Sequence, residues 1–206
     1  FSFDGLAAGE QVEVRMGISY VSTENARKNL DAEQAADATF DSIREQARRS
    51  WNEALGRIRV EGGTGEQQRV FYTALYHALL HPNLVSDVNG EYPLMERSGE
   101  TGMTDGERYT VFSLWDTYRN LHQLMTLVYP ERQLEMVRSM IGMYKEWGWL
   151  PKWELYGRET FTMEGDPAIP VIVDTWMKGL RDFDMDAAYE AMRKSATTPG
   201  AQNRMR

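Results

Sequence analysis

Hydrophobic and polar residues alternate strictly over residues 11–20, QVEVRMGISY. The apolar members of this segment fall on one face: Val12, Val14, Met16, Ile18 and Tyr20. A period of two predicts a β-strand with one face buried. Because a single strand is not stable alone, we expect it to complete a sheet whose other strands lie before residue 1.

After this segment, apolar residues recur every three or four positions, which is typical of amphipathic helices. The clearest stripe consists of Phe40, Ile43, Ala47, Trp51 and Leu55, and it predicts a long helix over residues 38–56. Further helices are predicted up to Leu30 and over residues 65–81, 114–128, 131–146, 168–180 and 185–196. The chain is therefore predicted to be mainly α-helical.

Local signals refine this pattern at two places. Ser22 or Thr23 can cap the first helix, since both hydroxyls suit an N-cap. Ile58 and Val60 predict a short strand that ends at Gly62-Gly63.

A long connection follows the helix predicted over residues 65–81. Within it, Asn89-Gly90 predicts a hairpin turn, because both residues tolerate positive φ angles. A connection of about 30 residues in a compact domain is usually functional. We expect helical hairpins that lie side by side, with the long connections after alternate helices forming one binding face.

The composition narrows the class of protein. The 206 residues are 42% hydrophobic and 11% aromatic, which suits one large domain or one domain and part of another. The net charge is −8 without a basic stripe, so we expect no nucleic-acid partner. There is no apolar run of about 18 residues that would span a membrane. The chain has no cysteine, which excludes disulfides and thiolate metal sites and suits a secreted or periplasmic bacterial protein. Both ends resemble cuts in a longer protein.

The segment FSLWDTYR, residues 112–119, carries the strongest candidate chemistry. Asp116 falls in the first turn of a predicted helix, and Arg119 at i+3 can pair with it. Trp115 offers an apolar face to the C–H side of a sugar ring, while Asp116 can accept hydrogen bonds from hydroxyls. The segment is either a sugar-binding cluster or a helix-start ion pair with Trp115 in the core.

Three tryptophans occur within residues 147–153, WGWLPKW, where Gly148 and Pro151 restrict the backbone. We interpret this segment as a binding platform that includes Trp153, with Glu154 as an adjacent polar group. Packing between helices is the alternative for at least one of the tryptophans.

The segment FTMEGDPAIP, residues 161–170, places two acids before an apolar helix. Asp166 is predicted as the N-cap, because proline is favoured at a first helical position and Pro167 follows it. Capping does not explain Glu164. A general acid at neutral pH needs a raised pKa, whereas a helix N-terminus favours the charged carboxylate. Both acids are therefore predicted to bind a ligand or brace the turn.

The histidines give no strong signal for a metal. His77 and His81 have i, i+4 spacing, but the segment HALLH lacks the glutamate of HExxH. We expect both, together with His122, to be structural. Neither GxGxxG nor GxxxxGK[ST] occurs in the chain.

Five stretches in order carry a resemblance to a known family. They are VRMGISYVSTENARKNL, FYTALYHALLHPN, FSLWDTYRNLHQL, GWLPKW and MEGDPAIPVIVDTWMKGLRDFD. Through them the chain resembles glycoside hydrolase family 92, the calcium-dependent exo-α-mannosidases. The resemblance implies a β-sandwich, linking helices and an (α/α)6 toroid. Residues 1–21 would end the sandwich, residues 22–61 would be linker helices, and residues 62–206 would form the first half of the toroid.

The same resemblance implies inverting hydrolysis of terminal α-mannosyl residues in α-mannosides and mannose-rich glycans. In such a reaction an acid protonates the leaving oxygen while a base activates water on the opposite face. Calcium (Ca²⁺) would hold the 2- and 3-hydroxyls of mannose. The catalytic acid, the base and most calcium ligands would lie after residue 206, in the remainder of the same polypeptide, which is expected to complete the fold.

This chain would then hold part of the mannose pocket. Asp116 would bind mannose hydroxyls beside Trp115 and Arg119, and Asp166 would join the same wall. Glu164 departs from the family pattern, because many relatives have an aliphatic residue there, and it is expected to help select the leaving-group sugar. A non-catalytic carbohydrate-binding or structural helical module remains the alternative, as does an (α/α)6 hydrolase of other sugar specificity.

Overall fold

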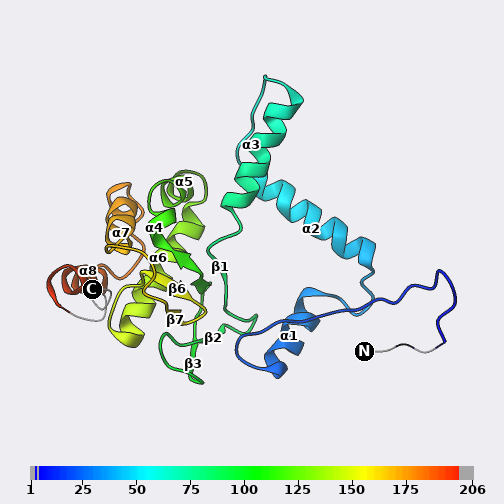
Figure 1. Ribbon diagram of the computed structural model, residues 1–206, viewed down its shortest axis with the longest axis horizontal. Helices are drawn as coiled ribbons and strands as arrows, with labels where there is room; N and C mark the ends of the chain where they lie inside the picture. The colour runs from blue at the N-terminus through cyan, green and yellow to red at the C-terminus, as the bar shows by residue number, and fades with distance from the viewer. Residues whose placement is uncertain (1–2, 4, 200–206) are drawn as a thin grey trace.

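A computed structural model describes residue 3 and residues 5–199 of the chain. Helices dominate the described part, as predicted, and short strands lie in the connections between them. Figure 1 shows a compact body built from the helices α4–α8 and most of the strands, while α2 and α3 extend away from it. The candidate site residues all lie in the compact body, so the fold of that body positions them.

The strand predicted over residues 11–20 is not formed. No other described segment pairs with this backbone, and an extended segment without a hydrogen-bonded neighbour is not a strand. Its apolar side chains are exposed, including Val14 and Met16. Tyr20 alone is anchored by a ring contact with the body, stacking on Tyr156 with the ring centroids 4.3 Å apart. The short strand predicted at Ile58 and Val60 is also absent.

Helix α1 (Thr23–Glu33) begins after Ser22, whose side chain accepts a hydrogen bond from Asn25 N. Of the two candidates from the sequence, Ser22 and Thr23, the N-cap is therefore Ser22. Two buried asparagines attach α1 to the turn at residues 87–91: Asn25 Nδ2 and Asn29 Nδ2 donate to the two carboxylate oxygens of Asp87, at 2.9 and 2.7 Å.

Helix α2 (Phe40–Leu55) has a capping box formed by Thr39 and Ser42. Its predicted apolar stripe is only partly used, since Trp51 and Leu55 pack against the core whereas Phe40 is 69% exposed. Helix α3 (Gly65–Ala78) follows Gly62 and Gly63, which both have positive φ angles.

The long connection after α3 contains two separate strand pairs. Strand β1 (Asn83–Leu84) pairs with β4 (Tyr109–Thr110), and β2 (Glu91–Pro93) pairs with β3 (Thr101–Met103), both antiparallel. The turn predicted at Asn89-Gly90 is confirmed, since Gly90 has a φ of 84° and its N–H donates to Asp87 O. The predicted hairpin is wrong, because the strands on either side of this turn, β1 and β2, pair with other partners.

The single helix predicted over residues 114–128 is broken in two. The one-turn helix α4 (Leu114–Thr117) and the helix α5 (Leu121–Val128) are separated at Asn120, which has a non-helical φ of −139°. The other predicted helices are confirmed as α6 (Pro130–Trp147), α7 (Ala168–Met177) and α8 (Met185–Thr197). Helix α6 ends at Gly148, whose φ of +93° is left-handed, as is common for a glycine that ends a helix.

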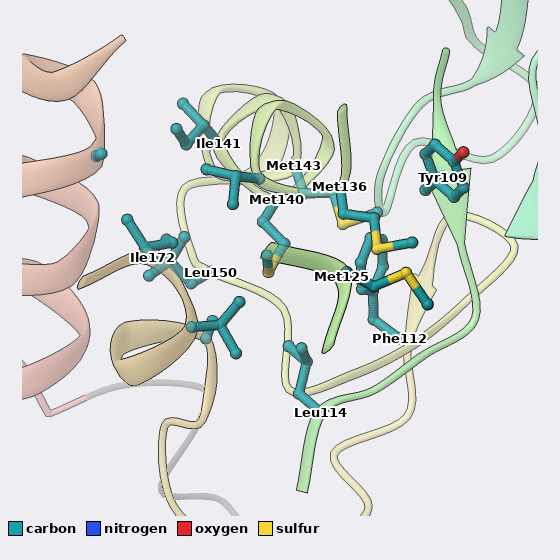
Figure 2. Packing of buried hydrophobic residues seen from close by; sticks show 14 of the residues in the cluster. Tyr109, Phe112, Leu114, Met125, Met136, Met140, Ile141, Met143, Leu150 and Ile172 are labelled. Carbon is teal, nitrogen blue, oxygen red and sulfur yellow. The ribbon is translucent and has the colours of Figure 1, made fainter. Parts of the chain in front are cut away.

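The core lies around α6, which packs against α5, α7 and α8. Figure 2 shows its methionine-rich centre, with side chains from several elements meeting at Met140. Fully buried members include Phe112, Leu114, Met125, Met136, Met140, Leu150 and Ile172. Beside this core, β5 (Phe112–Ser113), β6 (Trp153–Leu155) and β7 (Arg158–Glu159) form a three-stranded sheet.

Candidate functional site

The one-turn helix α4 presents the candidate residues Trp115 and Asp116. The Asp116 side chain is exposed and accepts a hydrogen bond from Ser113 Oγ. Arg119 forms no ion pair with Asp116. Its guanidinium carbon instead lies 4.8 Å from the ring centroid of Trp115 and 5.0 Å from that of Tyr118. Arg119 therefore shapes the site through the aromatic rings, and one carboxylate oxygen of Asp116 remains available.

Trp153 lies next to the start of α4. It is half-buried in β6, opposite Ser113 in the antiparallel register. The neighbouring Lys152 is buried, and its carbonyl accepts a hydrogen bond of 3.4 Å from Leu114 N. Two residues that are far apart in the sequence, Trp115 and Trp153, thus belong to one region.

Asp166 reaches the same region from the turn before α7. Gly165 lies beside Trp115, because a Cβ added to it would be 3.9 Å from Trp115 Cζ3. The prediction that Asp166 caps α7 with its side chain is wrong: the N-cap residue is Pro167, and only the backbone carbonyl of Asp166 accepts, from Ile169 N. The carboxylate is left free for another partner.

The environment of the Asp166 carboxylate is unusual for an acid. Its Oδ1 atom is buried and has no hydrogen-bond partner among the described residues. Burial raises the pKa of Asp166, and the positive charge of Lys152 opposes this shift. A desolvated carboxylate oxygen without a donor is stabilised when a ligand hydroxyl donates a hydrogen bond to it.

Glu164 differs from the other candidates. Its side chain is exposed and makes no hydrogen bond or ion pair with the described residues. The backbone before it is constrained, since Phe161 and Met163 have φ angles of 57° and 71°. The structure thus brings together Trp115, Asp116, Arg119, Trp153 and Asp166, and leaves Glu164 at the edge of the same loop.

Two buried glutamates hold the loop that carries Trp153. Glu159, which the sequence analysis did not single out, accepts hydrogen bonds from the backbone N–H groups of Lys152, Trp153 and Phe161, at 2.7, 2.9 and 2.9 Å. Glu154 is 1% exposed and accepts from Val111 N and Gly157 N. Its role is thus structural and not that of a polar group on a platform. For Glu159, the only sequence signal for this structural role was its position near Gly157 in a turn-rich segment.

The histidines have structural contacts. His122, as predicted, is buried, with Nδ1 3.0 Å from Gln133 Oε1 and Nε2 3.2 Å from Thr117 Oγ1. His81 Nδ1 lies 3.1 Å from Asn83 Oδ1. Within the part of the chain that the structure describes, no three His, Asp or Glu side chains are grouped so as to hold a metal ion.

Comparison with known proteins connects this geometry to a family. The sequence profile of the glycosyl hydrolase family 92 catalytic domain matches residues 25–206 of this chain. The chain belongs to glycosyl hydrolase family 92.

Solved structures agree with this assignment to family 92. A family GH92 α-mannosidase from Bacteroides thetaiotaomicron is 35% identical and superposes with a TM-score of 0.83 over 89% of this chain and 24% of its own. An inverting GH92 mannosidase of the same organism is 37% identical, with a TM-score of 0.80 over 89% of this chain and 25% of its own. The predicted fold class, mainly helical and shared with this family, is confirmed. The closed toroid and the domain boundaries remain predictions.

A curated relative from Arthroderma benhamiae, described as an uncharacterized secreted glycosidase, is 28% identical over 190 residues, which are 90% of this chain and 20% of the relative. The family 92 chain thus spans about a quarter of the solved relatives and a fifth of the curated one. No helix among the described residues is long and apolar enough to cross a membrane.

Proposed function

We propose that this chain forms part of the mannose pocket of an inverting exo-α-mannosidase that releases terminal mannose from α-mannosides and mannose-rich glycans. The observation that carries the proposal is the approach of Gly165, the neighbour of Asp166, to the ring of Trp115, the neighbour of Asp116, from two distant segments. Support comes from the solved relatives, one of which is named as an α-mannosidase and another as an inverting mannosidase.

The side chains offer complementary contacts for a sugar. Trp115 provides an apolar face with a guanidinium on its ring, which suits the C–H side of a pyranose. Asp116 has one carboxylate oxygen away from Ser113, and Asp166 has a buried oxygen without a donor. Sugar hydroxyls would donate to both, and charge-assisted hydrogen bonds of this kind are stronger than neutral ones. Trp153 and Arg119 would complete the wall.

The catalytic acid and base of the proposed enzyme lie outside this chain. The buried carboxylates of the loop that carries Trp153, those of Glu154 and Glu159, already accept hydrogen bonds from backbone N–H groups. Inversion needs two carboxyl groups roughly 6.5–9.5 Å apart on opposite faces of the sugar. The remainder of the polypeptide would supply them and complete the fold.

Calcium is expected for this family, but the described residues do not form a site for it. Three or more grouped acidic ligands are absent from the part of the chain that the structure describes, whereas Ca²⁺ takes six to eight oxygen ligands. From the family resemblance we propose that most calcium ligands lie after residue 206, and we assign no step to the ion here. Secretion to the outside or the periplasm is likewise proposed, on the likeness to a secreted glycosidase.

The test uses the intact protein that contains this chain and α-linked mannobiose as the substrate. Asp116→Asn removes the negative charge of the carboxylate that accepts hydrogen bonds from sugar hydroxyls, so kcat/KM should fall about 10- to 100-fold. Asp186→Asn, an equally exposed acid on α8, should leave kcat/KM unchanged. Equal activity of the two variants, or no mannose release by the wild type, would contradict the proposal and favour a non-catalytic binding module.

Glu164 provides a separate test of specificity within the same site. Its exposed carboxylate at the edge of the loop could contact the leaving-group sugar, so Glu164→Gln should change the preference among α-1,2-, α-1,3- and α-1,6-linked mannobioses. An unchanged ratio of rates across this panel would remove Glu164 from the site.

A further inference from the structure

The helix α4 is too short to hold its own orientation. It contains only four residues, and a single turn of helix is unfavourable in isolation. Two of its side chains attach it to the body. Leu114 is fully buried in the core, and Thr117 Oγ1 lies 3.1 Å from Ser113 O and 3.2 Å from His122 Nε2. The hydrogen bond from Ser113 Oγ to Asp116 and the pairing of Ser113 with Trp153 also orient this turn, and the contact of Thr117 is the one that connects it to α5.

The contact of Thr117 is the first of a series of buried hydrogen bonds. His122 Nδ1 lies 3.0 Å from Gln133 Oε1, and Gln133 Nε2 donates to Thr175 Oγ1 at 2.9 Å. The Thr175 hydroxyl donates to Val171 O at 2.7 Å. We call Thr117, His122, Gln133 and Thr175 the polar chain. Its members lie on α4, α5, α6 and α7, and the last three are at most 1% exposed.

The donors and acceptors of the polar chain have one consistent direction. Because Thr175 gives its hydroxyl proton to Val171 O, it accepts from Gln133 Nε2. The amide oxygen of Gln133 then faces His122 Nδ1, which carries the ring proton. The bare Nε2 atom faces the Thr117 hydroxyl, whose single proton is shared between Ser113 O, 3.1 Å away, and Nε2, 3.2 Å away. A neutral ring fits the burial of His122, which lowers its pKa to about 4.

We infer that the polar chain is a positioning element that fixes α4 relative to α7, and thereby sets the separation of Asp116 and Asp166. The inference rests on the proposed function. Asp166 is two residues before α7, and the polar chain ends on the first turn of that helix, at Val171. The two carboxylates come from segments that share no direct hydrogen bond, so a rigid connection between their helices would hold their separation constant.

The polar chain adds directional contacts to the packing between helices. Helices α5, α6 and α7 pack directly against one another through apolar contacts, which set no hydrogen-bond angle. Hydrogen bonds of 2.7–3.2 Å restrict both length and angle, and here each buried member depends on its neighbour. Loss of one hydroxyl leaves an unsatisfied partner and releases α4. A misplacement of about 1 Å in an active site can cost about 100-fold in rate.

The experiment compares Thr117→Val with Thr117→Ser in the intact protein. Valine keeps the shape of threonine without its hydroxyl, whereas serine keeps the hydroxyl and loses the methyl group. With α-linked mannobiose as the substrate, Thr117→Val should lower kcat/KM about 10- to 100-fold, mainly through kcat, and Thr117→Ser should stay within about threefold of the wild type. Thr175→Val should reproduce the loss, although Thr175 is far from the sugar, and Thr175→Ser should not.

The outcomes separate the inference from the proposed function. If the wild type is active and the valine and serine variants have equal kcat/KM, the polar chain has only a structural role and the inference is overturned. A lower melting temperature with unchanged kinetics in Thr117→Val leads to the same conclusion. If the wild type releases no mannose, the proposed function itself fails, and the inference fails with it. Should Thr175→Val not fold, the Thr117 pair decides, because Thr117 is only half-buried.

Discussion

The acidic side chains around the site differ in how many hydrogen-bond partners they already have. Glu154 and Glu159 are saturated by backbone donors, whereas Asp116 has one partner and Asp166 Oδ1 has none. A carboxylate that is already satisfied stabilises a loop, and one that is not is available for a ligand. This difference indicates structural roles for the two glutamates and is consistent with the binding roles that we propose for the two aspartates.

The charged side chain of Asp166 is predicted to lower the stability of the fold and to strengthen sugar binding. Because burial raises its pKa, the charged form that is present at pH 7 opposes folding. Asp166→Asn should therefore raise the melting temperature at pH 7, while KM for α-linked mannobiose rises about tenfold through the lost charge-assisted hydrogen bond. Thermal unfolding and steady-state kinetics of the intact protein measure both. A lower melting temperature with unchanged KM would make Asp166 a structural residue.

His122 is predicted to make the protein less stable in acid. Burial lowers the pKa of its ring to about 4, although the hydrogen bond to Gln133 Oε1 acts in the opposite direction. An unfolded histidine titrates near about 6.5, so between these values the unfolded state binds the extra proton. The contribution is fully present above about pH 6.5 and is lost as the pH falls toward about 4, with a total of about 3 kcal/mol.

This prediction is checked by thermal unfolding of the intact protein at pH 7 and at pH 4.5. His122→Gln should show a smaller loss of melting temperature between the two pH values than the wild type, because the glutamine does not titrate. His81→Gln, at an exposed position, should behave like the wild type. Equal losses in all three proteins would show that His122 does not control the acid response.

Part of the site could be predicted from the sequence, and part could not. Trp115 and Asp116 are adjacent, so their shared location follows from local pattern alone. The polar chain could not be predicted from the sequence. Its buried hydrogen bonds join His122 to Gln133, 11 positions later, and Gln133 to Thr175, a further 42 positions along the chain. The predicted pairing of Arg119 with Asp116 was locally reasonable, but the guanidinium gains more from two aromatic faces than from an exposed carboxylate.

Among the elements, α6 is joined to the long β-containing connection by contacts that include a buried ion pair. Arg108 Nη2 lies 2.9 Å from Glu146 Oε2, and the same guanidinium carbon lies 4.6 Å from the ring centroid of Tyr92. Gly142 on α6 makes room for it, since a Cβ at that position would lie 2.4 Å from Arg108 Nη1. The absence of a side chain at residue 142 therefore has a structural reason.

Gly142→Ala is predicted to displace Arg108 and leave Glu146 buried without its partner. Breaking a buried ion pair in this way costs about 3 kcal/mol or more, so the melting temperature should fall by several degrees. Gly65→Ala is the matched control, because a Cβ at this helical glycine meets no atom within 4 Å, and it should be nearly neutral. Equal melting temperatures for the two variants would show that Arg108 moves aside at no cost.

The predictions for elements succeeded where the pattern and the packing agree. Helices α6 and α8 bury the faces that their period of three to four residues indicates. The segment 11–20 failed because its alternation describes a strand that needs a neighbour, and no described segment provides one. The helix predicted over residues 114–128 failed because the turn at Asn120 depends on tertiary contacts of α4 and not on periodicity.

At the scale of the whole molecule, large apolar side chains remain exposed on several helices. Leu127 on α5 and Met177 on α7 are 82% and 67% exposed, and Phe40 on α2 is similar. Such exposure is uncommon on a folded surface that faces only water. We propose that the remainder of the polypeptide covers these faces, in line with the quarter of each solved relative that the chain spans.

The most direct test of the account is the anomeric form of the first mannose released from α-linked mannobiose. Proton NMR of the reaction of the intact protein, followed from the first minutes, distinguishes β-mannose from α-mannose before they equilibrate. We predict β-mannose first in the presence of calcium, loss of release with a chelator, and slow release by Asp116→Asn. Release of α-mannose first, or no release of mannose with calcium present, would contradict it.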